Sequence, residues 1–307
     1  MSGQIAPDLE GRAKGDAAAQ TMRRRRHLAP YLMLAPAGLF LTIFFVWPML
    51  QALLMAFQTS DGVLTLDNFR RMASDVNFWP AMRGTLLLIV AIIPLQMVLA
   101  LAMALLLNSG LRGTGFWLYA WAIPLAISDL AAGIVWLSIF TDRGYLNSLL
   151  VGLGLRDTPF SFLSYEHPLT NLLAVVVAET WRATSIVMVI LVAGLQVIPR
   201  EYGEAAEVFG ASSWQRLRHV TLPLLRPSIQ VALILRTILA FQVFAVVVAL
   251  AGRNLPVLAG EAYAWYGSYS NPQVAAAYAL LIMLFSIANT GVYLRALRTR
   301  DETAGML

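Results

Sequence analysis

The stretch Gly84–Leu111, with the sequence GTLLLIVAIIPLQMVLALAMALLLNSGL, contains no Asp, Glu, Lys or Arg. A charge-free apolar run of this length exceeds the ~20 residues that a helix needs to cross a bilayer. Two further charge-free runs, His27–Ser60 and Ala262–Leu294, lie on either side of it along the chain. The chain of 307 residues is 59% hydrophobic and 13% charged, whereas roughly a quarter of the residues in soluble domains are charged. The sequence therefore specifies a membrane protein.

Apolar runs separated by polar segments predict an all-α, polytopic membrane protein with six transmembrane helices. Six spans place both termini on the same side of the membrane. The expected spans are Pro30–Phe57, Trp79–Asn108, Phe116–Phe140, Asn171–Leu195, Ser228–Ala251 and Pro272–Leu294.

The distribution of basic residues predicts that both termini lie in the cytoplasm. Of the 22 Lys and Arg residues, 14 fall on the side of the termini, five on the opposite side, and three within or at the edge of spans. An excess of Lys and Arg is typical of cytoplasmic loops. The 14 are Arg12, Lys14, Arg23, Arg24, Arg25, Arg26, Arg112, Arg200, Arg216, Arg218, Arg226, Arg295, Arg298 and Arg300.

The predicted organisation has three parts. Residues 1–29 form a cytosolic, disordered, basic tail, residues 30–295 form the six-span transmembrane domain, and residues 296–307 form a second cytosolic tail. The first apolar stretch is much longer than the ~7–15-residue core of a signal peptide. The outer connections, residues 58–78, 141–170 and 252–271, carry the turn formers and mixed charges of solvated loops.

The cytosolic loop 196–227 differs from the others because acidic, basic and apolar residues alternate in it at helical spacing. Glu201, Glu204 and Glu207 recur every three residues, so they share one face of a short helix that Gly210 can end by adopting a positive φ. A second short helix, Ser212–Val220, begins at a serine N-cap and is expected to end before Pro223. This pattern predicts a structured loop.

The order of residues in this loop resembles the EAA loop of ABC-importer permeases. The resemblance rests on Glu204-Ala205-Ala206, on Gly210-Ala211, and on Val220-Thr221-Leu222-Pro223 at the expected distance. Further matches, among them Ala35-Pro36, Trp47-Pro48, Asp67-Asn68-Phe69, Ile123-Pro124 and Gly144-Tyr145-Leu146-Asn147, resemble the maltose and trehalose branch of sugar permeases. The chain departs from the family pattern at Phe209, where Asp is usual, and after the fifth span, where residues 251–256 replace Gly-Gly-Pro.

This resemblance implies a type I ABC-importer permease fold and a set of partners. A second, homologous permease subunit would complete the translocation path, two ABC ATPase subunits would bind ATP and Mg, and an extracytoplasmic solute-binding protein would deliver a sugar or polyol. The implied location is the cytoplasmic membrane of a bacterium or archaeon, as a multi-pass protein in the lipid bilayer. The implied ATPase-coupling residues are Glu201, Glu204, Ala205, Ala206, Gly210 and Ala211.

Motifs for chemistry within the chain are absent from its sequence. There is no cysteine, and the single lysine, Lys14, is followed by Gly15 rather than by the Ser or Thr of a phosphate-binding loop. His27, His167 and His219 lack metal-ligand spacing. We therefore expect a transport subunit that is not an enzyme, carries no cofactor of its own and does not bind nucleic acid.

Four charged residues, Asp129, Glu179, Arg182 and Arg236, fall within the expected spans. Each costs ~2.5–3.5 kcal/mol or more at the centre of a lone helix, so each should face a cavity or a partner. One interpretation is mutual pairing, Glu179 with Arg182 on one helical face and Asp129 with Arg236 between helices. The other is contact with the solute, because the resemblance to maltose permeases implies sugar-facing positions at Asp129, Glu179, Arg182, Arg236, Ala240 and Phe244.

Two alternative functions stay open at this stage. A permease of the same family for an anionic solute, such as glycerol phosphate or an acidic or sulfonated sugar, would suit Arg182 and Arg236. An ion- or proton-coupled secondary carrier or channel could use the intramembrane charges as a relay. We disfavour the carrier because it has no use for the EAA loop and because the expected spans show no pair broken by Gly or Pro in corresponding halves of the chain, which is a feature of inverted-repeat carriers.

Overall fold

The computed structural model describes residues 31, 33–110 and 112–297, so residues 1–29 and 298–307 of the predicted tails lie outside the described residues. The chain divides into two compact units between Met55 and Ala56. Among the described residues, five helices are long and apolar enough to cross a membrane, or six if a bent pair counts as one span. The prediction of an all-α, multi-span protein is confirmed.

The first unit contains one apolar helix, Met33–Met55, which matches the expected first span with slightly narrower limits. It includes a π-helical turn, η1 (Thr42–Val46), directly followed by α2 (Trp47–Met55). Pro48 explains the wider turn. A proline inside a helix lacks an N–H group, and its ring clashes with the carbonyl four residues earlier unless the turn opens.

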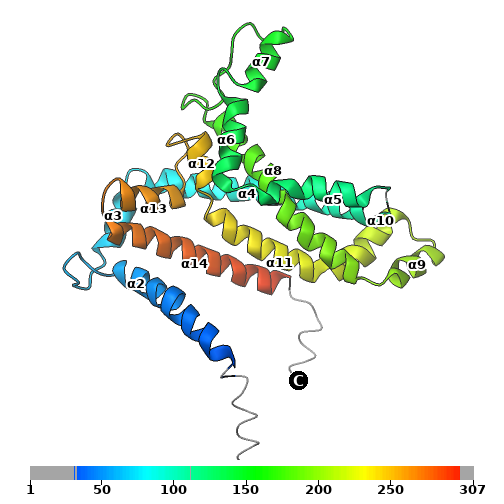
Figure 1. The fold of residues 1–307 in the computed structure, drawn as a ribbon, viewed down its shortest axis with the longest axis horizontal. Helices are drawn as coiled ribbons and strands as arrows, with labels where there is room; N and C mark the ends of the chain where they lie inside the picture. The colour runs from blue at the N-terminus through cyan, green and yellow to red at the C-terminus, as the bar shows by residue number, and fades with distance from the viewer. Residues whose placement is uncertain (1–30, 32, 111, 298–307) are drawn as a thin grey trace, which may run out of the picture. The chain divides into compact units, whose positions relative to one another are not determined.

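The second unit holds all the remaining helices (Figure 1). In chain order these are α3 (Asp67–Ser74), α4 (Phe78–Asn108), α5 (Thr114–Ala122), η2 (Ile123–Ala126), α6 (Asp129–Phe140), α7 (Tyr145–Gly152), α8 (Pro168–Val197), α9 (Arg200–Val208), α10 (Ser213–Arg216), η3 (Leu217–Thr221), α11 (Leu222–Phe241), α12 (Ala245–Leu250), α13 (Leu258–Gly267) and α14 (Pro272–Ala296).

Four long helices form the centre of this unit. α4 packs against α8 and α11, and α11 in turn packs against α8 and α14. Small residues allow close approach at one of these crossings, because a Cβ added at Gly194 of α8 would lie 2.2 Å from the Ser228 hydroxyl oxygen of α11. The core side chains at this crossing include Leu191, Leu195 and Leu225, all buried.

The expected third span, 116–140, is not one straight helix. The helix ends with the short 3₁₀ turn η2, and α6 begins after a bend of 100°. Ser128 explains the break: its extended backbone cannot continue the helix, and its hydroxyl accepts a hydrogen bond from the Ala131 N–H as the N-cap of α6. In Figure 1, α6 and α7 consequently point away from α5.

The expected fifth span, 228–251, is also not one straight helix. A continuous helix runs from Ser213 to Phe241 through the π turn η3, then breaks, and α12 forms a separate short helix. The expected stop before Pro223 is therefore wrong. Pro223 lies inside this continuous helix, and the π turn directly before it contains His219, whose carbonyl the proline ring would otherwise meet.

The two breaks bring α6 and α12 together. The pair packs closely, since a Cβ added at Gly133 of α6 would lie 2.5 Å from the Ala249 Cβ of α12. The expectation of one continuous helix for the third span and for the fifth span is therefore wrong, and the two interrupted helices meet in this unit.

The connection 252–271, expected as a solvated loop, contains the helix α13, which packs on α4 and α14. Its first residue, Leu258, is fully buried, and the Leu258 N–H donates to the Thr85 hydroxyl of α4 at 2.9 Å. The turn formers Gly252 and Pro256 are confined to the segment before α13. Composition alone therefore misjudged this connection.

Candidate functional site

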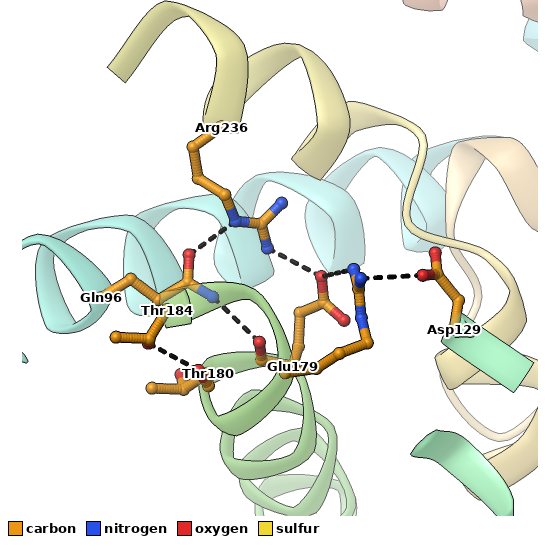
Figure 2. A network of polar contacts seen from close by, with 7 residues as sticks. Gln96, Asp129, Glu179, Thr180, Thr184 and Arg236 are labelled. Carbon is orange, nitrogen blue, oxygen red and sulfur yellow. Dashed lines mark hydrogen bonds and ion pairs between the residues drawn. The ribbon is translucent and has the colours of Figure 1, made fainter. Parts of the chain in front are cut away.

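A charge network connects three of the central helices (Figure 2). The guanidinium of Arg236 on α11 donates from Nη2 to Glu179 Oε1 of α8 at 2.8 Å, and from Nε to Gln96 Oε1 of α4 at 2.6 Å. Gln96 in turn donates to the Glu179 backbone carbonyl at 2.9 Å. All three side chains are buried, so this part of the network is a closed tie between α4, α8 and α11.

Arg182 extends the network to α6. Its Nη2 lies 3.0 Å from Glu179 Oε1, one turn back along α8, and its Nη1 lies 2.9 Å from Asp129 Oδ1. The side chain of Arg182 is 16% exposed and that of Asp129 is 51% exposed, against 1% for both Glu179 and Arg236. The network therefore has a buried end at Arg236 and an open end at Asp129.

The structure brings all four predicted intramembrane charges together, but with different partners from those expected. The pair Glu179–Arg182 is confirmed, whereas the suggested pair Asp129–Arg236 is wrong: Arg182 and Glu179 lie between them. Whether these residues also contact a solute stays a prediction.

Several polar atoms of the network have no hydrogen-bond partner within the described chain although they are buried. They are Arg236 Nη1, Arg182 Nε, Glu179 Oε2 and the Thr180 hydroxyl. A buried polar group without a partner is costly, so such atoms require water, a neighbouring subunit or a bound molecule. The network can thus offer both donors and acceptors beyond those it uses internally.

The other two predicted solute-path residues, Ala240 and Phe244, lie outside the network. Ala240 is buried one turn beyond Arg236. Phe244 lies in the break before α12, and its ring centroid is 4.8 Å from that of Tyr263 on α13. Both residues therefore lie at or just beyond the carboxyl-terminal end of α11 and take no part in the charge network.

Gln96 is a site residue that the sequence analysis missed. It is fully buried and bonds both Arg236 and the backbone of α8. The available signal was a lone amide within the apolar part of the run Gly84–Leu111, where a polar side chain without a function would be disfavoured.

The loop 196–227 contains the short helix α9, which ends as predicted. Gly210 has φ +80° directly after it, the left-handed conformation that glycine adopts without strain. Ser212 caps the next helix in a reciprocal capping box with Gln215, which confirms the expected N-cap. Glu207 and Arg216 form an ion pair that holds α9 against α10.

The surface of α9 is open. Glu201, Glu204 and Ala205 are exposed, whereas Ala206 is partly covered. Beyond the helix, Phe209 is 90% exposed. A cleft of about 490 Å³ lies between α9, the ends of α4 and α8, and η3, with Arg200 and Glu204 among its lining residues. Exposed large apolar residues beside polar groups are typical of a protein-docking surface.

A second polar cluster, which no sequence pattern indicated, links the segment before α4 to α13 and α14. Asp75 Oδ2 accepts hydrogen bonds from Trp265 Nε1 of α13 at 2.7 Å and from the Tyr278 hydroxyl of α14 at 3.1 Å. Glu261 of α13 lies 3.5 Å from Arg253. Burial raises the pKa of the Glu261 carboxyl, and the Arg253 charge opposes this shift only in part.

Metal chemistry receives no support from the site: no group of three His, Asp or Glu residues able to hold a metal occurs among residues 31, 33–110 and 112–297. The site thus has two parts. One is a charge network among apolar helices, in which two carboxylates balance two arginines. The other is the exposed helix α9, next to the start of the continuous helix Ser213–Phe241.

Comparison with known proteins identifies relatives with this organisation. The chain is 31% identical over 286 residues to the trehalose/maltose transport system permease protein MalF of Thermococcus litoralis, covering 89% of this chain and 94% of that one. It is 31% identical over 287 residues to the sn-glycerol-3-phosphate transport system permease protein UgpA of Agrobacterium fabrum, covering 89% and 96%.

A solved structure has the same fold. The structure of a bacterial ABC transporter involved in the import of the acidic polysaccharide alginate aligns with a TM-score of 0.76 at 21% identity, covering 91% of this chain and 98% of that one. The model of the family "Binding-protein-dependent transport system inner membrane component" matches residues 17–295. The chain is therefore a member of this family of membrane transport subunits, which confirms the resemblance stated above.

Proposed function

We propose that the chain forms half of the translocation path of an ABC importer for a sugar or related polyol. A second, homologous permease subunit supplies the other half, and an extracytoplasmic binding protein delivers the solute. Two ATPase subunits, which bind ATP and Mg, drive the cycle. The observation that carries this proposal is the exposed helix α9, which ends before Gly210 and contacts the start of the continuous helix Ser213–Phe241.

The mechanical step follows from this continuity. α10, η3 and α11 form one helix from Ser213 to Phe241, and the Glu207–Arg216 ion pair fixes α9 to its cytosolic end. Movement of an ATPase docked on α9 would therefore displace α11 as a rod, together with Arg236 near its far end. Rigid helices that shift between two packed arrangements are a common basis of switching.

The solute class rests on relatives and on the charge network. MalF is named as a trehalose/maltose permease, and the open end of the network offers a carboxylate and a guanidinium, which suit neighbouring hydroxyl groups. The second candidate, an anionic solute, is favoured by the name of UgpA. The proposed solute-path residues remain Asp129, Glu179, Arg182, Arg236, Ala240 and Phe244.

We further propose the cytoplasmic membrane of a bacterium or archaeon as the location, with both termini in the cytoplasm. The basic residues of the tails and of the loop around α9 support this orientation. Helices α3, α7 and α13 would then face the binding protein.

The test uses the complete importer reconstituted in proteoliposomes. Glu204→Lys and Gly210→Pro should abolish the ATPase activity that sugar-loaded binding protein stimulates, because they disrupt the α9 surface and its exit turn. Solute binding by the binding protein should be unchanged. Asp301→Lys, an equal charge change in the predicted carboxyl-terminal tail, serves as the control. Wild-type stimulation in both α9 variants would refute the coupling role.

A further inference from the structure

The charge network discriminates between the two solute classes left open above, and the inference drawn from it rests on the proposed function. Exposure increases along the network, from Arg236 and Glu179 at 1% through Arg182 at 16% to Asp129 at 51%. A charge at this depth is disfavoured against lipid, so the open end should face the path or its partner subunit. A solute would therefore meet Asp129 and Arg182 first.

The network carries no uncompensated cation. Its two arginines are matched by two carboxylates, and each guanidinium is bonded to at least one of them (Figure 2). An anionic solute needs a cation that is free to pair with it. Here Arg182 is held on both sides, by Glu179 at 3.0 Å and by Asp129 at 2.9 Å.

Asp129 also occupies the position where an anion would bind most favourably. It is the first residue of α6, a helix of 12 residues whose N-terminus is capped by Ser128. The N-terminus of a helix attracts negative charge. Together with the Arg182 guanidinium it would form an anion site, and the Asp129 carboxylate fills that site from within the chain.

We infer that Asp129 is the specificity-determining residue that excludes anionic solutes and sets this permease for a neutral, hydroxylated solute. Sugar hydroxyl groups can donate to the Asp129 carboxylate and accept from Arg182. Two further donors of the network, Arg236 Nη1 and Arg182 Nε, are buried and have no hydrogen-bond partner among the described residues. A carboxylate or phosphate on the solute would instead be repelled by Asp129.

The test measures ligand-dependent thermal stabilisation of the assembled permease–ATPase complex in lipid nanodiscs, without the binding protein. The probes are trehalose, a neutral disaccharide, and glucuronate, a single glucose ring with one carboxylate, and each probe is compared between wild type and variant. The wild-type complex should be stabilised by trehalose and not by glucuronate at the same concentration. Asp129→Asn should bind glucuronate at least tenfold more tightly than wild type, while its apparent affinity for trehalose changes by less than about fivefold, because an amide still hydrogen-bonds.

Two control variants separate this effect from general charge and from misfolding. Asp142→Asn removes the same charge at an exposed position just beyond the other end of α6 and should behave as wild type. Asp129→Glu keeps the charge and should keep the exclusion, and Asp129→Ser provides a second neutral side chain if the asparagine variant assembles poorly.

An unchanged glucuronate response in the neutral Asp129 variants, or an equal gain in Asp142→Asn, would overturn the inference. Stronger stabilisation of wild type by glucuronate than by trehalose would overturn it as well. Failure of the proposed function would look different: the wild-type importer would show no ATPase stimulation by sugar-loaded binding protein, whatever the effect of Asp129.

Discussion

Breaking the buried tie between α8 and α11 should destabilise the assembled protein, and the two partners should not contribute equally. Loss of one member of a buried ion pair costs ~3–5 kcal/mol because the other charge stays uncompensated. Arg236→Gln leaves Glu179 with a second cation, Arg182, at 3.0 Å. Glu179→Gln leaves Arg236 without a carboxylate, whereas Arg182 keeps Asp129. We therefore expect about 3 kcal/mol for Arg236→Gln and about 5 kcal/mol for Glu179→Gln.

These values convert into measurable shifts of the melting temperature. At roughly 2–4 °C per kcal/mol for a chain of this size, Arg236→Gln should lower the Tm of the purified complex by about 6–12 °C. Glu179→Gln should lower it by about 10–20 °C. Static light scattering or intrinsic fluorescence of the detergent-purified complex measures both, with abundance in the membrane as a second readout. Arg70→Gln, in the exposed pair Arg70–Asp67, is the control and should change Tm little.

The double variant decides whether the pair is the cause. The double variant Glu179→Gln, Arg236→Gln removes both charges. Its decrease in Tm should therefore be well below the sum of the decreases in the two single variants. Strictly additive losses would contradict the tie, as would single variants with wild-type Tm. Glu179→Gln milder than Arg236→Gln would contradict the assigned geometry, because Arg182 then could not be the shared partner.

Two further predictions concern packing and pH. Gly194→Val should prevent the close approach of α8 to α11, since a Cβ there would lie 2.2 Å from the Ser228 hydroxyl oxygen and 2.9 Å from a Leu225 methyl group. We expect loss of the folded complex on size-exclusion chromatography. The control Gly152→Val, at a position with open space around it, should assemble normally. Because the pKa of Glu261 is raised in the fold, ionisation of this carboxyl lowers stability as the pH rises from the ordinary carboxyl pKa through the folded value. The Tm of Glu261→Gln relative to wild type should therefore increase over that pH range, and a constant difference would refute the buried, proton-binding carboxyl.

Features encoded locally could be predicted from the sequence. The charge-free runs identified the membrane spans because length and apolarity alone decide whether a helix can cross a bilayer. The end of α9 at Gly210 and the cap at Ser212 were also predictable, since both depend on the conformational preference or hydrogen bonding of a single residue.

Features set by packing between helices could not be predicted. The breaks at 127–128 and 242–244 each contain one polar residue, Ser128 and Gln242, within otherwise largely apolar spans, and hydropathy does not distinguish a straight span from a bent one. Their directions depend on the packing of α6 against α12. The partners within the charge network were missed for a related reason: which arginine meets which carboxylate depends on the depth and rotation of each helix, and these are fixed by contacts such as that of Gly194 with Ser228.

The uninterrupted helix from Ser213 to Phe241 also constrains how this region can evolve. Each residue of an α-helix adds about 100° of rotation and 1.5 Å of rise. A one-residue insertion between Arg216 and Arg236 would thus turn the latter away from Glu179 while leaving the amino-terminal end of the helix in place. The π turn at Leu217–Thr221 contains one residue more than an α-helical turn, as it would after a one-residue insertion into a regular α-helix. Chain length should therefore be invariant here and free to vary in the connection that carries α7.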